Sequence, residues 1–191
     1  MTNAKPSPDH DGLDAERFDT PTIWIHWLTL ALICILFATA WLRDPEANAP
    51  QAAVLLVVHR STGVAIWTLT MARLVWHWSR GHRPALPDEM GRFQRFAARA
   101  NEYALYALLV LQPLTGLAQS LFPAKPFALF FGTVPAIFVR NRPLTHFAHD
   151  FHEYGAWALL GLIAVHALAA LFHHFLMRDQ VLKSMLPWPA K

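Results

Sequence analysis

The sequence predicts an all-α integral membrane protein, a bundle of four transmembrane helices with both termini in the cytoplasm. Of its 191 residues, 54% are hydrophobic and only 15% are charged, whereas a soluble domain usually carries about a quarter charged residues. The apolar residues fall into four long blocks, and a helix needs roughly 20 such residues to cross a hydrocarbon core of about 30 Å. The blocks and their connections fill nearly the whole chain, which excludes a separate soluble catalytic domain.

The two ends of the chain lie outside the predicted bundle. Residues 1–20 contain no apolar run of the kind found in a cleavable signal peptide, and we expect a disordered cytoplasmic tail there. Thr20 and Pro21 then supply an N-cap and a proline in the first helical turn. We expect the transmembrane domain over residues 21–186 and a short C-terminal tail over residues 187–191.

Hydropathy places the spans and their connections along this domain. The four spans are expected at about 22–42, 52–78, 101–121 and 145–176. Residues 79–99 are expected to form a loop rich in Arg, Pro and Gly. Residues 122–144 form a longer connection whose apolar part, 127–131, is expected in the membrane interface.

Lysine and arginine divide unevenly between the two sides of this bundle. Ten of them lie in the N-terminal tail, the second connection and the C-terminus, which share one side, and four lie on the other. By the positive-inside rule, the side with ten is cytoplasmic. The same topology explains the sequence pI of 9.4 without a nucleic-acid partner.

Eleven histidines in so apolar a chain need a functional explanation, because ionisable residues inside a span are costly. A lone membrane histidine can simply hydrogen-bond to a neighbouring helix, so the argument depends on four of them. His152 and His166 lie ~21 Å apart along the fourth span and differ by about 40° in direction. His26 and His59 lie at depths of about 7 and 28 Å on the first two spans, which again differ by ~21 Å.

The fourth span can therefore offer one histidine at each of two levels. His166 pairs with His26 near the cytoplasmic side, and His152 pairs with His59 near the outer side. Two facing imidazoles inside a helix bundle form a bis-histidine haem site, whereas zinc usually takes four protein ligands, or three and a water. The pattern predicts haem at each level, and the single cysteine excludes paired-cysteine attachment of c-type haem.

Two arginines and three glycines lie close to these levels. Haem propionates need cationic partners, and Arg60 lies at the outer level while Arg73 lies toward the inner end of the second span. Snorkelling of the side chain to the interface explains Arg73 nearly as well. Gly63, Gly155 and Gly161 either leave room for a haem edge or allow close helix packing.

Other histidines lie nearer the membrane surfaces. His173 and His174 are expected to bind a quinone, to relay a proton, or to be interfacial histidines. His149 is turned about 100° from His166, which makes it a poorer ligand than His152. The remaining histidines are expected to be exposed or interfacial: His10, His77, His82 and His146.

Several runs of the sequence resemble those of prokaryotic cytochrome b561 proteins. They are Thr22-Ile-Trp-Ile-His26-Trp-Leu behind Arg17-Phe-Asp-Thr-Pro, His59-Arg-Ser-Thr-Gly63 with Arg73, and His152-Glu followed by Gly161-Leu-Ile-Ala-Val-His166 and His173-His174. The resemblance covers about residues 17–186. It implies four transmembrane helices in the bacterial inner membrane and two haem b groups.

The resemblance also implies ligands and electron partners. By motif, the axial ligands fall on His26, His59, His152 and His166. Members exchange electrons with the quinone pool, and some oxidise superoxide at the outer face while reducing ubiquinone, which would make the chain a quinone-linked oxidoreductase. Where many relatives have a histidine entering the third span, this chain has Asn101-Glu102-Tyr103, so a site that depends on that histidine is not implied.

The sequence leaves two other functions open. A haem-bearing membrane-anchor subunit of a larger dehydrogenase would dock a partner subunit, and the apolar stretch 127–131 suits such a surface. A homodimer is a related arrangement. A small proton-coupled transporter would use its histidines without haem, and this function leaves the matching depths unexplained.

Overall fold

The structure is a computed structural model that describes residues 17–81, 84–85, 90–130 and 132–188. Four long helices make up most of it: α2 (Thr20–Trp41), α3 (Ala49–Ser79), α4 (Arg92–Leu121) and α5 (Arg142–Phe172). All four are long and apolar enough to cross a membrane. The predicted all-α class and the four predicted spans are confirmed.

Three of the helices begin in the same way. Asp19, Asn48 and Asn141 are the N-caps of α2, α3 and α5, and each side chain accepts a hydrogen bond from a backbone N–H of the first turn. A proline follows in the first turn of each of these helices, where its missing N–H costs nothing. For α2 the cap is therefore Asp19, one residue before the expected Thr20.

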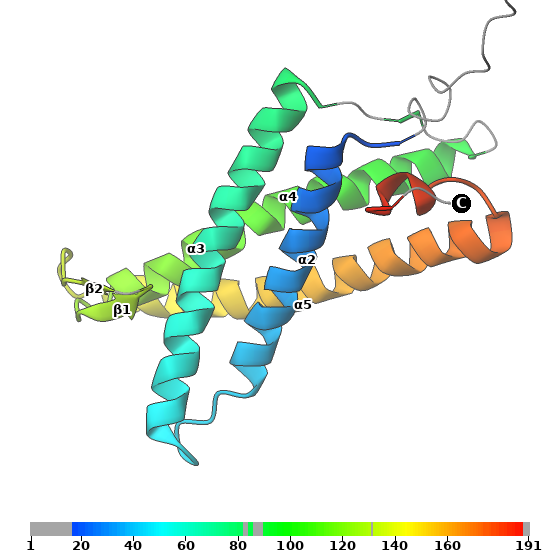
Figure 1. Cartoon of the computed structure of the whole chain (residues 1–191). Helices are drawn as coiled ribbons and strands as arrows, with labels where there is room; N and C mark the ends of the chain where they lie inside the picture. Colours follow the sequence, from blue (N-terminus) through cyan, green and yellow to red (C-terminus); the bar gives the residue numbers. More distant parts are fainter. Residues whose placement is uncertain (1–16, 82–83, 86–89, 131, 189–191) are drawn as a thin grey trace, which may run out of the picture.

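The helices are arranged as two pairs that cross in Figure 1. The chain packs α2 along α3 and α4 along α5, and α3 also contacts α4. Among the described residues, α5 makes no comparably extended backbone contact with α2 or α3. Helix α5 therefore faces the first helix pair mainly through side chains, and this face carries the predicted histidines.

The third helix begins earlier than the hydropathy pattern predicts. The sequence predicts a loop up to residue 99, but α4 starts at Arg92, where Gly91 donates a backbone hydrogen bond to Oε1 of Gln94. Residues 92–99 are mostly Arg, Gln and Ala, which are good helix formers. Hydropathy marks where a span leaves the apolar layer, whereas the helix itself continues beyond that point.

The connection between α4 and α5 contains a small hairpin that the sequence did not predict. Strands β1 (Phe127–Leu129) and β2 (Gly132–Val134) pair antiparallel, with Phe127 opposite Val134. Phe127 is buried, and the backbone N–H of Phe130 donates to Oγ of Ser61 on α3 (2.7 Å). The apolar stretch is thus attached to the end of the bundle that we call the hairpin end.

The opposite end, which we call the terminal end, holds the start of α2 and the C-terminal segment together (Figure 1). After α5 the chain forms a π-helical turn, η1 (His173–Met177), and then a 3-10 turn, η2 (Lys183–Met185). The guanidinium of Arg17 donates to the carbonyl oxygen of Leu186, and the indole N–H of Trp27 donates to that of Met185. The predicted tail over residues 1–20 is therefore too long by at least residues 17–20, and residues 1–16 lie outside the described part.

Candidate functional site: two facing histidine pairs

The structure brings the four predicted histidines together two by two. His26 on α2 faces His166 on α5, with ring centres 6.1 Å apart. His59 on α3 faces His152 on α5, with ring centres 6.2 Å apart. We call these the first pair and the second pair; the first lies toward the terminal end and the second toward the hairpin end.

The separation of the rings in both pairs matches that of two imidazoles bound to one metal ion from opposite sides. A metal–nitrogen bond is about 2.0 Å and the nitrogen lies about 1.1 Å from the ring centre, so two opposed rings have centres about 6 Å apart. The rings do not stack on each other, since their planes are inclined by 57° in the first pair and 74° in the second. Both pairs therefore fit bis-histidine ligation.

Hydrogen bonds fix the tautomer of both rings in the second pair. Nδ1 of His59 lies 3.1 Å from the carbonyl oxygen of Leu36 and 3.2 Å from Oγ1 of Thr39. Nδ1 of His152 lies 3.0 Å from the carbonyl oxygen of Gln112 and 3.1 Å from Oγ1 of Thr115. A carbonyl oxygen can only accept, so Nδ1 carries the proton in both rings and Nε2 keeps a lone pair for a metal.

Further contacts between α4 and α5 also hold His152 in place. Gln112 is buried and its side-chain amide donates to the carbonyl oxygen of His152 (2.9 Å). A Cβ atom at Gly116 would lie 3.1 Å from Cε1 of the His152 ring, so glycine is what allows this helix to approach. Gly155 serves the same helix contact, because a Cβ there would lie 2.8 Å from Oε1 of Gln112. Of the two roles predicted for Gly155, the structure shows packing.

The first pair has a cation beside it instead of carbonyl oxygens. A guanidinium nitrogen of Arg73 lies 3.5 Å from Nδ1 of His26, and the guanidinium also lies over the ring of Tyr106. Nε of Arg73 and Oγ1 of Thr70 are buried without a hydrogen-bond partner among the described residues. His166 is exposed, whereas the other three predicted histidines are half-buried.

The second arginine, Arg60, lines a cavity next to the second pair. The cavity has a volume of about 370 Å³ and lies between α3, the end of α4 and β1, with Lys125 in its wall. Nε of Arg60 donates to Oγ of Ser120 (3.1 Å), and the guanidinium lies over the ring of Phe127. These contacts hold the half-buried guanidinium of Arg60 close to His59.

The donor set fits haem better than a bare metal ion. The described residues contain no group of three or more His, Cys, Asp or Glu side chains that could hold a metal, and zinc needs at least three protein ligands. A porphyrin supplies four nitrogens itself and takes its axial ligands from the protein. A Cβ atom at Gly63, one turn from His59, would meet no other atom within 4 Å, so α3 leaves space near that histidine, whereas Gly161 is open because it is exposed.

The remaining histidines lie apart from the two pairs. His149 is exposed and lies 3.8 Å from Glu153, one helical turn away. Nδ1 of His173 is bonded to the carboxylate of Asp179, and Nδ1 of His174 is buried without a hydrogen-bond partner among the described residues. His10 and His82 lie outside the described residues.

Comparison with known proteins identifies the family. The family model described as prokaryotic cytochrome b561 matches residues 17–188. Cytochrome b561 homolog 1 of Escherichia coli K12 is 30% identical over 90% of this chain and 97% of its own length, and homolog 2 is 29% identical over 90% and 92%. A probable superoxide oxidase of Yersinia pestis, CybB, is 27% identical over 90% and 97%.

These matches cover the four helices and all four paired histidines, and they agree with the fold and with the donor set. The chain belongs to the prokaryotic cytochrome b561 family: it is a multi-pass bacterial membrane protein that binds b-type haem and transfers electrons.

Proposed function

We propose that each histidine pair holds one haem b, so that the chain carries electrons between the two sides of the bacterial inner membrane. The observation that supports this most directly is the pair of nearly equal ring separations on one helix. His152 and His166 are fourteen residues apart on α5, or ~21 Å along its axis, which sets the two sites at different depths. Two haems would supply one-electron chemistry at both depths.

The orientation of the two sites in the membrane follows from the charge distribution. Ten lysines and arginines lie on the side of the termini and four on the other side. The positive-inside rule then puts the terminal end in the cytoplasm and the hairpin end outside. The second pair faces the outer medium in this orientation, and the first pair faces the cytoplasm.

An anionic donor suits the outer side. Arg60 and Lys125 give the cavity beside the second pair two positive charges, and a cleft with one sign of charge raises the local concentration of oppositely charged substrates. Arg60 can also pair with a haem propionate. Superoxide is a small anion, and one relative is named as a probable superoxide oxidase.

A quinone suits the inner side. His173 and His174 lie at the terminal end, about two turns beyond His166, where a protonated imidazole nitrogen can donate a hydrogen bond to a quinone carbonyl. Two superoxide ions would lose one electron each, and one ubiquinone would take up both electrons and two protons to become ubiquinol. Glu102 occupies the position where the resemblance leads us to expect a histidine, so we propose no quinone ligand there.

The experiment is the superoxide-dependent reduction of a short-chain ubiquinone by the purified protein. We expect quinol to form with wild-type protein, and to form about tenfold more slowly at low ionic strength in the variant Arg60→Gln, Lys125→Gln, with added salt narrowing the difference. Gln119→Ala in the same cavity wall is the uncharged control. Quinol formation no faster than without protein would exclude this donor and acceptor pair.

A membrane-anchor subunit of a larger dehydrogenase is the second candidate. The observation that favours it is an apolar surface at the hairpin end, where Phe130, Ile137 and Val139 are exposed. Purification after mild extraction distinguishes the two functions. An anchor subunit would co-purify with a soluble partner protein and would show no activity with superoxide. A transporter without haem does not agree with the family.

A further inference from the structure

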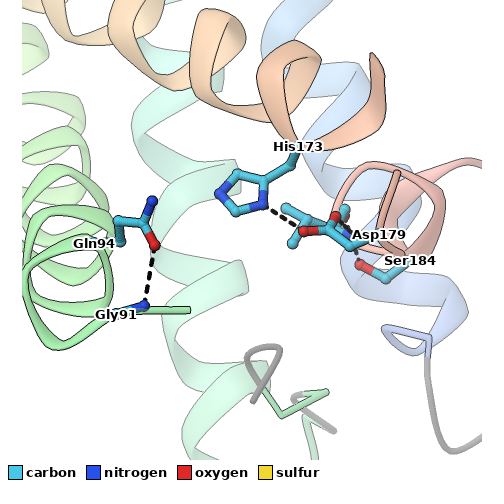
Figure 2. A network of polar contacts seen from close by, with 6 residues as sticks. Gly91, Gln94, His173, Asp179 and Ser184 are labelled. Carbon is cyan, nitrogen blue, oxygen red and sulfur yellow. Dashed lines mark hydrogen bonds and ion pairs between the residues drawn. The ribbon is translucent and has the colours of Figure 1, made fainter. Parts of the chain in front are cut away.

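Just beyond α5, at the terminal end, the chain carries a histidine–carboxylate pair that the electron path does not use. Nδ1 of His173 is bonded to Oδ2 of Asp179, and the backbone N–H of Asp179 donates to the carbonyl oxygen of His173 (3.3 Å) (Figure 2). The side chains are only 12% and 18% exposed. Two contacts between the same two residues make this a fixed arrangement.

The backbone takes an unusual course to bring these two residues together. In a continuous α-helix, residues six apart point in directions about 120° from each other and lie ~9 Å apart along the axis, so they cannot meet. Here η1 widens the helix at His173, and Arg178 then takes a left-handed conformation (φ 56°) that reverses the chain. π-Turns and left-handed non-glycine residues cost energy and concentrate at functional sites.

The rest of the C-terminal segment keeps the carboxylate in place. Oδ1 of Asp179 accepts a hydrogen bond from the backbone N–H of Val181 (3.0 Å). The segment beyond it is attached to the start of α2, since the N–H of Phe18 donates to the carbonyl oxygen of Ser184 (3.2 Å). Asp179 therefore cannot turn away from His173 without breaking these contacts.

The carboxylate determines which nitrogen of His173 is free. A carboxylate accepts from Nδ1–H, so Nδ1 carries a proton and Nε2 is available on the other side of the ring. Figure 2 shows that other nitrogen turned away from Asp179 and toward Gln94, at the start of α4. Nε2 of His173 thus points toward the start of α4.

We propose that Asp179 is a positioning residue for His173, and that this pair gives a proton to the quinone at the cytoplasmic side. The proposal rests on the proposed function. Nε2 of His173 first takes a proton from water at the cytoplasmic surface, and the negative charge of Asp179 faces the ring while it is protonated. When ubiquinone takes up two electrons, this proton passes to the carbonyl oxygen that faces Nε2, and the other carbonyl oxygen takes its proton from water.

The alternative is that Asp179 only caps the chain reversal through Val181. Asp179→Ser separates the two roles, because a serine hydroxyl can accept the same local backbone hydrogen bond but carries no charge. Asp179→Asn keeps the size of the side chain. Glu153→Gln is the matched control, because it removes the carboxylate of the exposed His149–Glu153 pair at the other end of α5.

The test follows haem absorbance in purified protein that has been reduced with dithionite, mixed with a short-chain ubiquinone. Only folded, haem-loaded protein contributes to this signal. We expect reoxidation about 100-fold slower in Asp179→Asn, Asp179→Ser and His173→Ala, with a larger solvent isotope effect in D2O for the two Asp179 variants. The double variant His173→Ala, Asp179→Asn should be no slower than the slower single variant.

Each outcome has one meaning. Reoxidation within threefold of wild type in Asp179→Ser would overturn the proposal, and so would additive losses in the double variant. If wild-type haem is not reoxidised by quinone at all, the proposed acceptor is wrong, and the positioning role fails with it. If Asp179→Asn yields no loaded protein, Asp179→Ser alone decides, because it keeps the cap.

Discussion

The two histidine pairs have similar ring separations but different surroundings. In the second pair, both Nδ1 atoms face backbone carbonyl oxygens and threonine hydroxyls. In the first pair, the guanidinium of Arg73 faces Nδ1 of His26, whereas Arg60 near the second pair donates to Ser120 rather than to an imidazole. An acceptor on Nδ1 makes a histidine a more basic ligand and favours ferric haem, whereas a nearby cation favours the ferrous form.

This difference gives the electron path a direction. We expect the haem at the second pair to have the lower potential and the haem at the first pair the higher one. Electrons that enter at the hairpin end then run downhill toward the terminal end, which is the direction that quinone reduction in the cytoplasmic half requires.

The largest effect should come from breaking the second pair alone. Gly116→Val puts a branched side chain where even a Cβ would lie 3.1 Å from Cε1 of His152. The ring is pushed out of position, and we expect about half of the haem to be lost. Gly91→Ala at the N-cap of the same helix is the control, because its Cβ would meet only Oε1 of Gln94 at an ordinary 3.7 Å. Full haem content in Gly116→Val, measured by pyridine haemochrome, would contradict the site.

Removing the cation should change the reduction potential of the haem at the first pair and leave that of the haem at the second pair unchanged. Arg73→Gln takes away the positive charge beside His26. We expect the potential of the first haem to fall by about 60–120 mV, because a tenfold change in a one-electron equilibrium corresponds to about 60 mV. A spectroelectrochemical titration measures both potentials together. A shift in the second haem instead would reverse the assignment of the two sites.

Removing the threonine hydroxyls should change the reduction potential of the haem at the second pair slightly. Thr39→Val and Thr115→Val each delete one contact to Nδ1 of a ligand, while the carbonyl oxygen stays. The ligand becomes a little less basic, and we expect the potential of the second haem to rise by roughly 20 mV in each variant. The same titration tests this, with Thr68→Val, an exposed threonine on α3, as the control.

The smallest effect on the two haem sites should come from Asp19, which caps α2 and also accepts a hydrogen bond from the indole N–H of Trp76 (2.5 Å). Burial raises the pKa of this carboxyl, but hydrogen bonds from Thr22 and Trp76 outweigh it, and the pKa lies below the ordinary 3.8. Because the pKa of Asp19 is lowered in the folded state, its charge stabilises the fold at every pH above the ordinary pKa. This stabilisation is lost as the pH falls through the lowered pKa.

Asp19→Ala should therefore lower the free energy of unfolding by about 1 kcal/mol at neutral pH. Thermal unfolding in detergent, from neutral pH down to about pH 3, measures the difference. Asp19→Asn keeps a cap but carries no charge. We expect its unfolding temperature and that of the wild type to become equal at the acid end of this pH range. A constant difference across the whole range would show that the charge of Asp19 contributes nothing.

The sequence predicted the fold and the meeting of the histidines because both depend on regular helix geometry. A rise of about 1.5 Å per residue suffices to match depths on different spans. The hairpin was missed because its strands are three residues long and its turn places Phe130, not glycine, at positive φ (51°). Such a turn lacks the Asn-Gly or Asp-Gly signal that predicts a hairpin.

The surroundings of the site were less predictable. Gln112 could have been noticed as a lone amide in an apolar span, but its partner depends on how α4 packs against α5. Asp179 could not have been found from helix periodicity, because the π-turn and the reversal at Arg178 bring it back to His173. Periodic elements predict position along an axis, and irregular backbone decides the closest contacts.

The central claim is that each pair holds one haem. The most direct measurement is the number of b haems per chain in detergent-purified protein, by pyridine haemochrome, for the wild type, His59→Ala and His166→Ala. We predict two haems in the wild type and about one in each variant, with the remaining haem differing in potential between the two variants. One haem in the wild type, or unchanged content in either variant, would contradict the account.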